Sequence, residues 1–170
     1  DVDGTTNLDV VDIDGALTQD GGAVFNEASA DVDFRVESNG NANMLFVDGG
    51  NNTVVVGQSA PDTTLSGGTP AFQVIGSGFE SFASLTRRVA SSSGPLLILA
   101  KSRNTSVGSH TVVQNGDVTG EIVFIADDGT DFDSRTAVIK AEIDGAPDAN
   151  DTPGRLVFMT SADGANSPTE

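Results

Sequence analysis

The feature that most constrains this chain is that its apolar runs are short and that each one stops at a glycine turn. Three such runs lie within residues 31–57. They are Val32–Val36, Met44–Val47 and Val54–Val56, which stop at Gly40, Gly49 and Gly57. None reaches the ten or so residues that an ordinary helix needs, and the first alternates apolar with polar residues as a half-buried strand does. The pattern therefore predicts an all-β chain of short strands and tight turns.

Strands of this length bury little surface by themselves. A two-stranded hairpin is marginally stable at best in water, and it cannot cover both of its faces. The face that a hairpin leaves exposed has to be covered by other strands, either of the same chain or of another copy. We take this need for a partner as the main clue to what the protein does.

Composition and charge exclude several classes of partner. The chain has 170 residues, which is enough for one ordinary domain or two small ones. Eight basic residues against twenty-five acidic residues give a net charge of −17. Such a chain repels nucleic acids and anionic membranes, because both are bound through Lys and Arg. No apolar run approaches the eighteen or so residues of a membrane span.

The absence of cysteine excludes disulfides and cysteine-containing zinc or iron–sulfur sites. Stability must then come from packing or from assembly. The sequence opens on Asp1 without a methionine and ends in the turn-like residues 166–170. We expect it to be part of a longer protein.

The glycine-stopped pattern divides the chain into three parts. Residues 1–60 are predicted to form a short-strand shaft or adaptor region, which includes an alternating run at Leu8–Ile13 and a strand candidate at Ala23–Asn26. Residues 61–70 form the centre of a linker that is rich in Pro, Gly, Ser and Thr. Residues 71–170 resume the strand pattern with longer runs.

Seven strands are predicted in this last part, with turn signals about every ten residues. They are Ala71–Ile75, Phe82–Arg87, Pro95–Ala100, Thr111–Val113, Glu121–Ala126, Ala137–Ile143 and Arg155–Thr160. The spacing predicts a β-sandwich or a jelly-roll-like module. The sixth run could also form one or two helical turns, but its β-branched residues and the Asp-Gly pair that follows favour a strand.

Several segments resemble bacteriophage tail-fibre and other virion fibre proteins. One is the strand–turn–strand NANMLFVDGGNNTVVVG at residues 41–57. The others follow in order over most of residues 71–170: SLTRR (84–88), GPLLILAKSR (94–103), NGDVTGEIVFIADDGTDF (115–132) and DTPGRLVFMTSADG (151–164). No single segment is diagnostic, but their order and spacing are fairly specific.

This resemblance implies a homotrimeric, β-rich fibre or spike on the surface of a virion. Its partners would be two further copies of itself, other virion proteins at one end, and a host surface glycan or protein. Such fibres often end in a self-cleaving chaperone domain, and no segment here matches one. The family offers no catalytic residues to carry onto this chain.

Candidate catalytic residues are few. His110 is the only histidine, and the residues around it, Gly108–Thr111, lack a nucleophile-elbow pattern. Carboxylate pairs chosen from Asp127, Asp131 and Glu142 could hydrolyse a glycan, as virion depolymerases do. The chain has no Trp or Tyr to line a sugar-binding cleft, and aspartates are expected at turns. We therefore expect a protein that is not an enzyme and that has no catalytic or cofactor-binding residues.

Two charged clusters are candidate binding sites. Asp127–Asp133 offers four carboxylates, the hard ligands that calcium prefers, but it lacks the glutamate that closes an EF-hand loop. Asp1–Gly4 is a weaker candidate. We expect solvated turns at both and no metal site. Half of the positive charge lies at Arg87, Arg88, Lys101 and Arg103, where we expect pairing with carboxylates across a chain interface rather than binding of an anionic sugar.

The function expected from these observations is that of a structural virion protein, a trimeric phage fibre or spike that contributes to host attachment. The alternatives are a module of a virion spike that binds host glycans, a polysaccharide depolymerase of such a spike, and a non-viral surface adhesin that depends on calcium.

Overall fold

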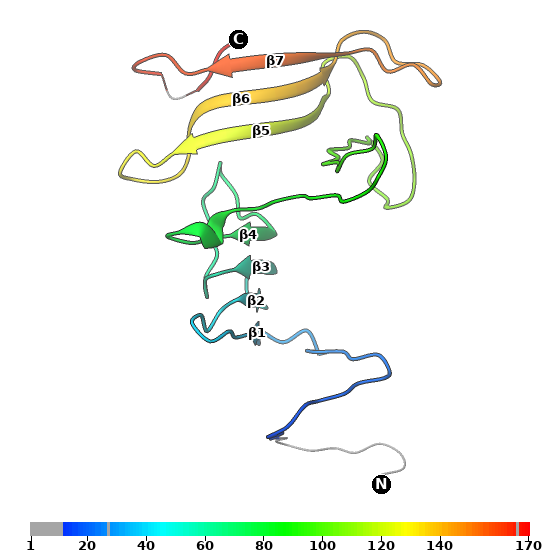
Figure 1. Cartoon of the computed structure of the whole chain (residues 1–170). Coiled ribbons are helices and arrows are strands. Elements are labelled where there is room, and N and C mark those ends of the chain that lie inside the picture. Colours follow the sequence, from blue (N-terminus) through cyan, green and yellow to red (C-terminus); the bar gives the residue numbers. More distant parts are fainter. Residues whose placement is uncertain (1–11, 27, 166) are drawn as a thin grey trace.

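The computed structural model describes residues 12–26, 28–165 and 167–170 and shows an all-β chain (Figure 1). These residues form seven strands in two separate sheets, with one turn of 3-10 helix, η1 (Phe79–Ser81), after the first sheet. The all-β prediction is therefore confirmed. Figure 1 shows the four short strands of the first sheet as a stack on one side of the second sheet.

The first sheet has four strands of three or four residues, in the order in which they follow along the chain. They are β1 (Phe34–Val36), β2 (Leu45–Asp48), β3 (Thr53–Val56) and β4 (Phe72–Val74). The first three pair antiparallel, and the three strands predicted between residues 32 and 56 are confirmed. β4 pairs parallel with β3, so the linker brings the chain back to the start of a neighbouring strand.

A hydrogen-bonded turn joins β2 to β3. The backbone N–H and the side-chain amide of Asn51 donate to the two carboxylate oxygens of Asp48, at 2.8 and 2.9 Å. These bonds lower the pKa of Asp48, which is buried. A side chain on Gly49 would meet the backbone of Val32 at 2.8 Å, so only glycine fits here.

The second sheet is an antiparallel meander of three longer strands. They are β5 (Val118–Ala126), β6 (Ser134–Ile143) and β7 (Gly154–Thr160). Residues 137–143 lie within β6, so their predicted strand conformation is confirmed. The two sheets are connected through Ser66, whose N–H donates to the carbonyl of Phe132 at 3.1 Å and whose hydroxyl accepts from the Nε of Arg135 at 3.0 Å.

Four of the predicted strands are wrong. Residues 82–87, 95–100 and 111–113 are exposed for most of their length and form no strand, and neither does Ala23–Asn26. Their apolar pattern is typical of strands, but in the described part of the chain no neighbouring strand pairs with their backbones. The alternating run that begins at Leu8 lies largely outside the described residues.

The β-sandwich or jelly-roll architecture is not confirmed in the single chain. No strand of the first sheet packs extensively on a strand of the second within the described ranges. The boundaries 1–60, 61–70 and 71–170 remain a prediction.

The chain exposes far more surface than a folded monomer of its size. Its accessible surface is 13313 Å², whereas a compact monomer of 17.3 kDa exposes about 7,800 Å². The thirteen residues outside the described ranges would add about 1,900 Å² if fully extended, which leaves an excess of about 3,600 Å². The buried apolar side chains are correspondingly few: Phe46, Val55, Val113, Val138, Ile143 and Val157. The single chain is therefore folded locally but incompletely covered.

Gly57, at the end of β3, provides a test of this fold. Its φ of +100° is a conformation that side chains rarely adopt, and an added Cβ would overlap the carbonyl oxygen of Ile75. We expect Gly57→Ala to lower the free energy of unfolding by about 1–3 kcal/mol. Urea denaturation at a fixed protein concentration measures this.

Gly40→Ala is the matched control, because nothing lies within 4 Å of a Cβ at Gly40 and its φ is not in the left-handed region. Equal effects of the two substitutions would contradict the described end of β3.

Candidate functional site

The first sheet carries an entirely apolar face. Its register aligns Phe34, Val47, Val54 and Phe72 in one row across the four strands. A second row on the same side pairs Val36 with Leu45 and Val56 with Val74, because alternate residues of a strand share a face. We call these eight residues the first apolar face. All are exposed or half-buried, and Phe72 keeps 63% of its surface exposed.

The opposite face of this sheet is more polar, yet it is the side that the chain covers. Its buried residues are Phe46, Asp48, Thr53, Val55 and Gln73. The linker helps to cover it: the side-chain amide of Gln73 accepts from the N–H of Asp62 at 3.0 Å and donates to the carbonyls of Asp62 and Pro70 at 3.1 and 3.2 Å. A soluble single-chain sheet usually buries its apolar face and leaves its polar face in water. Here the arrangement is reversed.

A shallow hollow of about 420 Å³ lies beside the first apolar face. Phe34 and Val47 line it, together with Phe25, whose ring centre lies 4.9 Å from that of Phe34. The hollow is open and mixed in character, because Asn26, Asp48 and Asn52 line it beside the apolar side chains. It extends the uncovered surface beyond the strands themselves.

The second sheet exposes an apolar face as well. Its register aligns Ile122 with Ile139 and Phe158, and the neighbouring rows on the same side add further apolar residues. We call this group the second apolar face: Ile122, Phe124, Ala137, Ile139, Ala141, Leu156 and Phe158. Leu156 and Phe158 each keep 66% of their surface exposed. Both sheets therefore present apolar faces that the described residues leave uncovered.

An ion-pair cluster lies on the other side of the second sheet. Glu142, which is buried, accepts from Lys140 at 2.8 Å and from the Nε of Arg155 at 2.7 Å. The contacts with Lys140 and then Arg155 lower the pKa of Glu142. A carboxylate held in this ionised form is a poor general acid.

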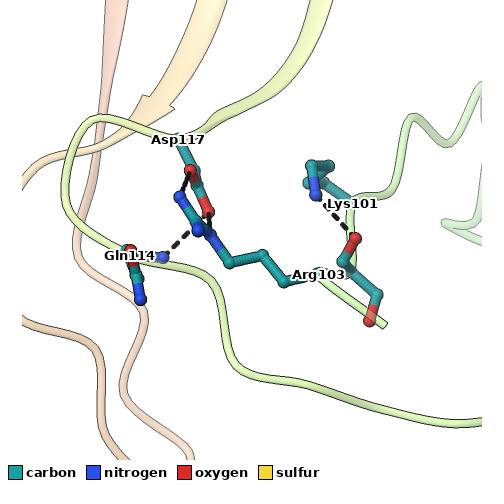
Figure 2. Close-up of polar contacts among 5 residues, drawn as sticks. Lys101, Arg103, Gln114 and Asp117 are labelled. Carbon is teal, nitrogen blue, oxygen red and sulfur yellow. Dashed lines mark hydrogen bonds and ion pairs between the residues drawn. The ribbon is translucent and has the colours of Figure 1, made fainter. Parts of the chain in front are cut away.

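Figure 2 shows a second ion pair, which fixes the chain just before β5. The Nε and Nη2 of Arg103 donate to the two oxygens of Asp117, both at 2.6 Å, and the N–H of Gln114 donates to the same carboxylate at 2.9 Å. These contacts, led by that with Arg103, hold the pKa of Asp117 far below its usual range. The prediction that Arg103 pairs across a chain interface is therefore wrong, because its partner lies fourteen residues away in the same chain.

The other basic residues of this cluster do not converge on one site. Lys101 donates to the neighbouring carbonyl of Ser102 at 2.6 Å, and Arg87 reaches the carbonyl of Gly94 at 3.5 Å. Sequence spacing therefore indicated a basic region correctly but not an anion-binding pocket.

The candidate catalytic residues are not brought together either. His110 is exposed in the loop before β5. Asp127 and Asp131 lie in the turn after β5, whereas Glu142 pairs with Val118 at the opposite end of the sheet. Asp127 accepts from the N–H of Gly129 at 2.7 Å, and Asp131 from that of Asp133 at 3.0 Å. These carboxylates act as turn residues.

The same turn was the candidate calcium site. Asp128 accepts from the N–H groups of Thr130 and Asp131 and from the hydroxyl of Ser134, and these bonds lower its pKa. No group of three or more acidic or histidine side chains is arranged to hold a metal in the part of the chain that the structure describes. The candidate at Asp1–Gly4 lies outside that part.

Comparison with known proteins adds no family. No protein-family model matches the chain, and no curated protein matches it. Within the described ranges, no helix has the length and hydrophobicity that crossing a membrane requires. The two apolar faces therefore remain the candidate functional surface. The sequence does not predict them, because alternation within one strand does not show how neighbouring strands align.

The Arg103–Asp117 pair makes stability depend on pH. Because the folded-state pKa of Asp117 lies below its unfolded value of about 3.9, the pair stabilises the protein fully above that value. The stabilisation is lost as the pH falls through the folded pKa. We expect Asp117→Asn to lower the urea midpoint near neutral pH and to lose this effect progressively below about pH 4.

Asp163→Asn, in an exposed turn, is the control and should leave the midpoint unchanged at each pH. A difference between Asp117→Asn and the unmodified protein that grows on acidification would contradict the ion pair.

Proposed function

We propose that this protein is a structural virion protein, a homotrimeric phage fibre or spike that projects from the particle and contributes to host attachment. The observation that carries the proposal is the pair of exposed apolar faces. A chain that buries the more polar face of a sheet and exposes the apolar face is suited to packing against copies of itself. The resemblance of residues 41–57 and of most of residues 71–170 to virion fibre proteins supports the same conclusion.

The amount of uncovered surface is consistent with an obligate assembly. The excess of about 3,600 Å² per chain falls in the range of permanent interfaces, which bury about 2,000–5,000 Å² and are more apolar than transient ones. Contiguous apolar patches on monomers rarely exceed a few hundred Å².

A closed trimer would also protect the strand edges. β1 and β4 are the outer strands of the first sheet, and free edges of this kind invite uncontrolled pairing. Three copies around an axis can direct their first apolar faces inward, and cyclic symmetry ends the assembly at a fixed number of copies. The net charge of −17 keeps the outer surface soluble.

The role of such a fibre is mechanical and adhesive. One end would attach to other virion proteins, and the other would present a surface to the host. Recognition of an anionic host glycan by Lys101 and Arg103 is less favoured, because both side chains already bond within the chain. A depolymerase is also less favoured, since Asp127 and Glu142 lie at opposite ends of a sheet.

Light scattering coupled to size exclusion tests the proposal. The unmodified protein should elute as a particle of about 52 kDa, three times the 17.3 kDa of one chain. Val36→Glu, which places a charge on the first apolar face, should abolish the trimer, because burial of an unpaired carboxylate costs several kcal/mol.

Val107→Glu is the matched control. Val107 is also exposed, but it lies in the loop between residues 104 and 110, away from both apolar faces. It should leave the mass unchanged. A stable particle of 17.3 kDa from the unmodified protein would contradict the proposal.

A further inference from the structure

The residues Pro95–Ala100, which we call the apolar segment, are exposed on both sides. Leu96, Leu97 and Ile98 keep 77%, 72% and 76% of their surface exposed. Consecutive residues cannot all lie on one face of a strand or helix, so exposed apolar side chains lie on more than one side of the segment. No strand in the described part of the chain pairs with this segment.

The backbone of the segment is unpaired as well. Within the described ranges, residues 83–102 form no hydrogen bond between their backbone groups and the backbone of another residue. Water can satisfy these groups, but water does not cover four consecutive large apolar side chains. An apolar segment whose backbone is unpaired has the properties of a strand whose partner belongs to another molecule.

The structure also shows which surface the segment fits. A Cβ added to Gly120 would lie 2.6 Å from the Cβ of Leu99, so the side chain of Leu99 occupies the space that glycine leaves open. Gly120 aligns with Ala141 and Leu156 at one end of the second apolar face. The chain's own segment reaches this end and leaves Ile122, Phe124 and Phe158 exposed.

Charge favours a second copy as the occupant. Residues 81–117 contain four basic side chains and one acidic side chain, Asp117, which pairs with Arg103, so this part carries +3, while the rest of the chain carries −20 to give the total of −17. Whole copies repel one another, but the region around the apolar segment attracts the remainder of a neighbouring chain. Complementary charge of this kind sets orientation and register at an interface.

We propose that the apolar segment of one copy lies on the second apolar face of a neighbouring copy, so that the three chains exchange segments around their axis. The inference rests on the proposed trimer and specifies how its subunits interlock. The Arg103–Asp117 pair ties the chain to its own sheet just after the apolar segment ends, and Leu96–Ile98 precede this point in the sequence. In this arrangement the apolar segment of one chain and the second apolar face of the next chain bury each other's side chains.

Cysteine cross-linking tests the exchange, because the chain has no cysteine of its own. Leu97→Cys and Phe158→Cys are introduced into separate chains that carry different tags, and the two chains are co-expressed. A short bismaleimide should join one chain of each kind in high yield. Val107→Cys in place of Leu97→Cys is the matched control, and it should give at least tenfold less of the mixed product.

Three outcomes would overturn the exchange. A trimer by light scattering with no mixed product above the control shows that the segment lies elsewhere, and it leaves the proposed function intact. A dominant Phe158–Phe158 product shows that the second faces pack directly on one another. A monomer removes both proposals. If either variant fails to fold, Ile98→Cys with Ile122→Cys makes the same test on neighbouring positions.

Discussion

The alignment of the four strands in the first sheet is the constraint on which the rest of the structure depends. It places Phe34, Val47, Val54 and Phe72 in one row and brings every residue of that side to an apolar face. A shift of one residue in any strand would turn its apolar side chains to the other face. The turn at Asp48–Asn52 and the close approach at Gly49 hold this alignment.

Several polar side chains of the chain are bonded internally, whereas much of its apolar surface is left exposed. Gln73 forms hydrogen bonds with the linker. Glu142 pairs with Lys140 and Arg155, and Arg103 pairs with Asp117. These contacts give each sheet a defined shape before any partner is present. The hydrophobic effect, which is the dominant favourable term in folding, then remains largely available for association. In the proposed trimer, these hydrogen bonds and ion pairs would shape each chain locally, and apolar burial between chains would complete the fold.

The sequence predicts the strands whose partners are close along the chain. Alternation and glycine turns identify β1, β2 and β3, and the runs at 121–126, 137–143 and 155–160 lie within β5, β6 and β7. The strand prediction fails at Pro95–Ala100, because an apolar run indicates that a segment is suited to burial but does not show which strand it pairs with. The parallel pairing of β4 with β3 and the Arg103–Asp117 pair were missed for a related reason. Both join residues whose proximity depends on the three-dimensional course of an irregular segment.

The central claim, that association completes the fold, is tested most directly by the dependence of the unfolding temperature on protein concentration. A trimer that unfolds to separate chains becomes more stable by mass action as its concentration rises. Over a hundred-fold dilution series, followed by circular dichroism at constant pH and salt, the account predicts an unfolding temperature that falls steadily with dilution. An unfolding temperature that stays constant over the whole series, with a particle mass of one chain at every concentration, would contradict it.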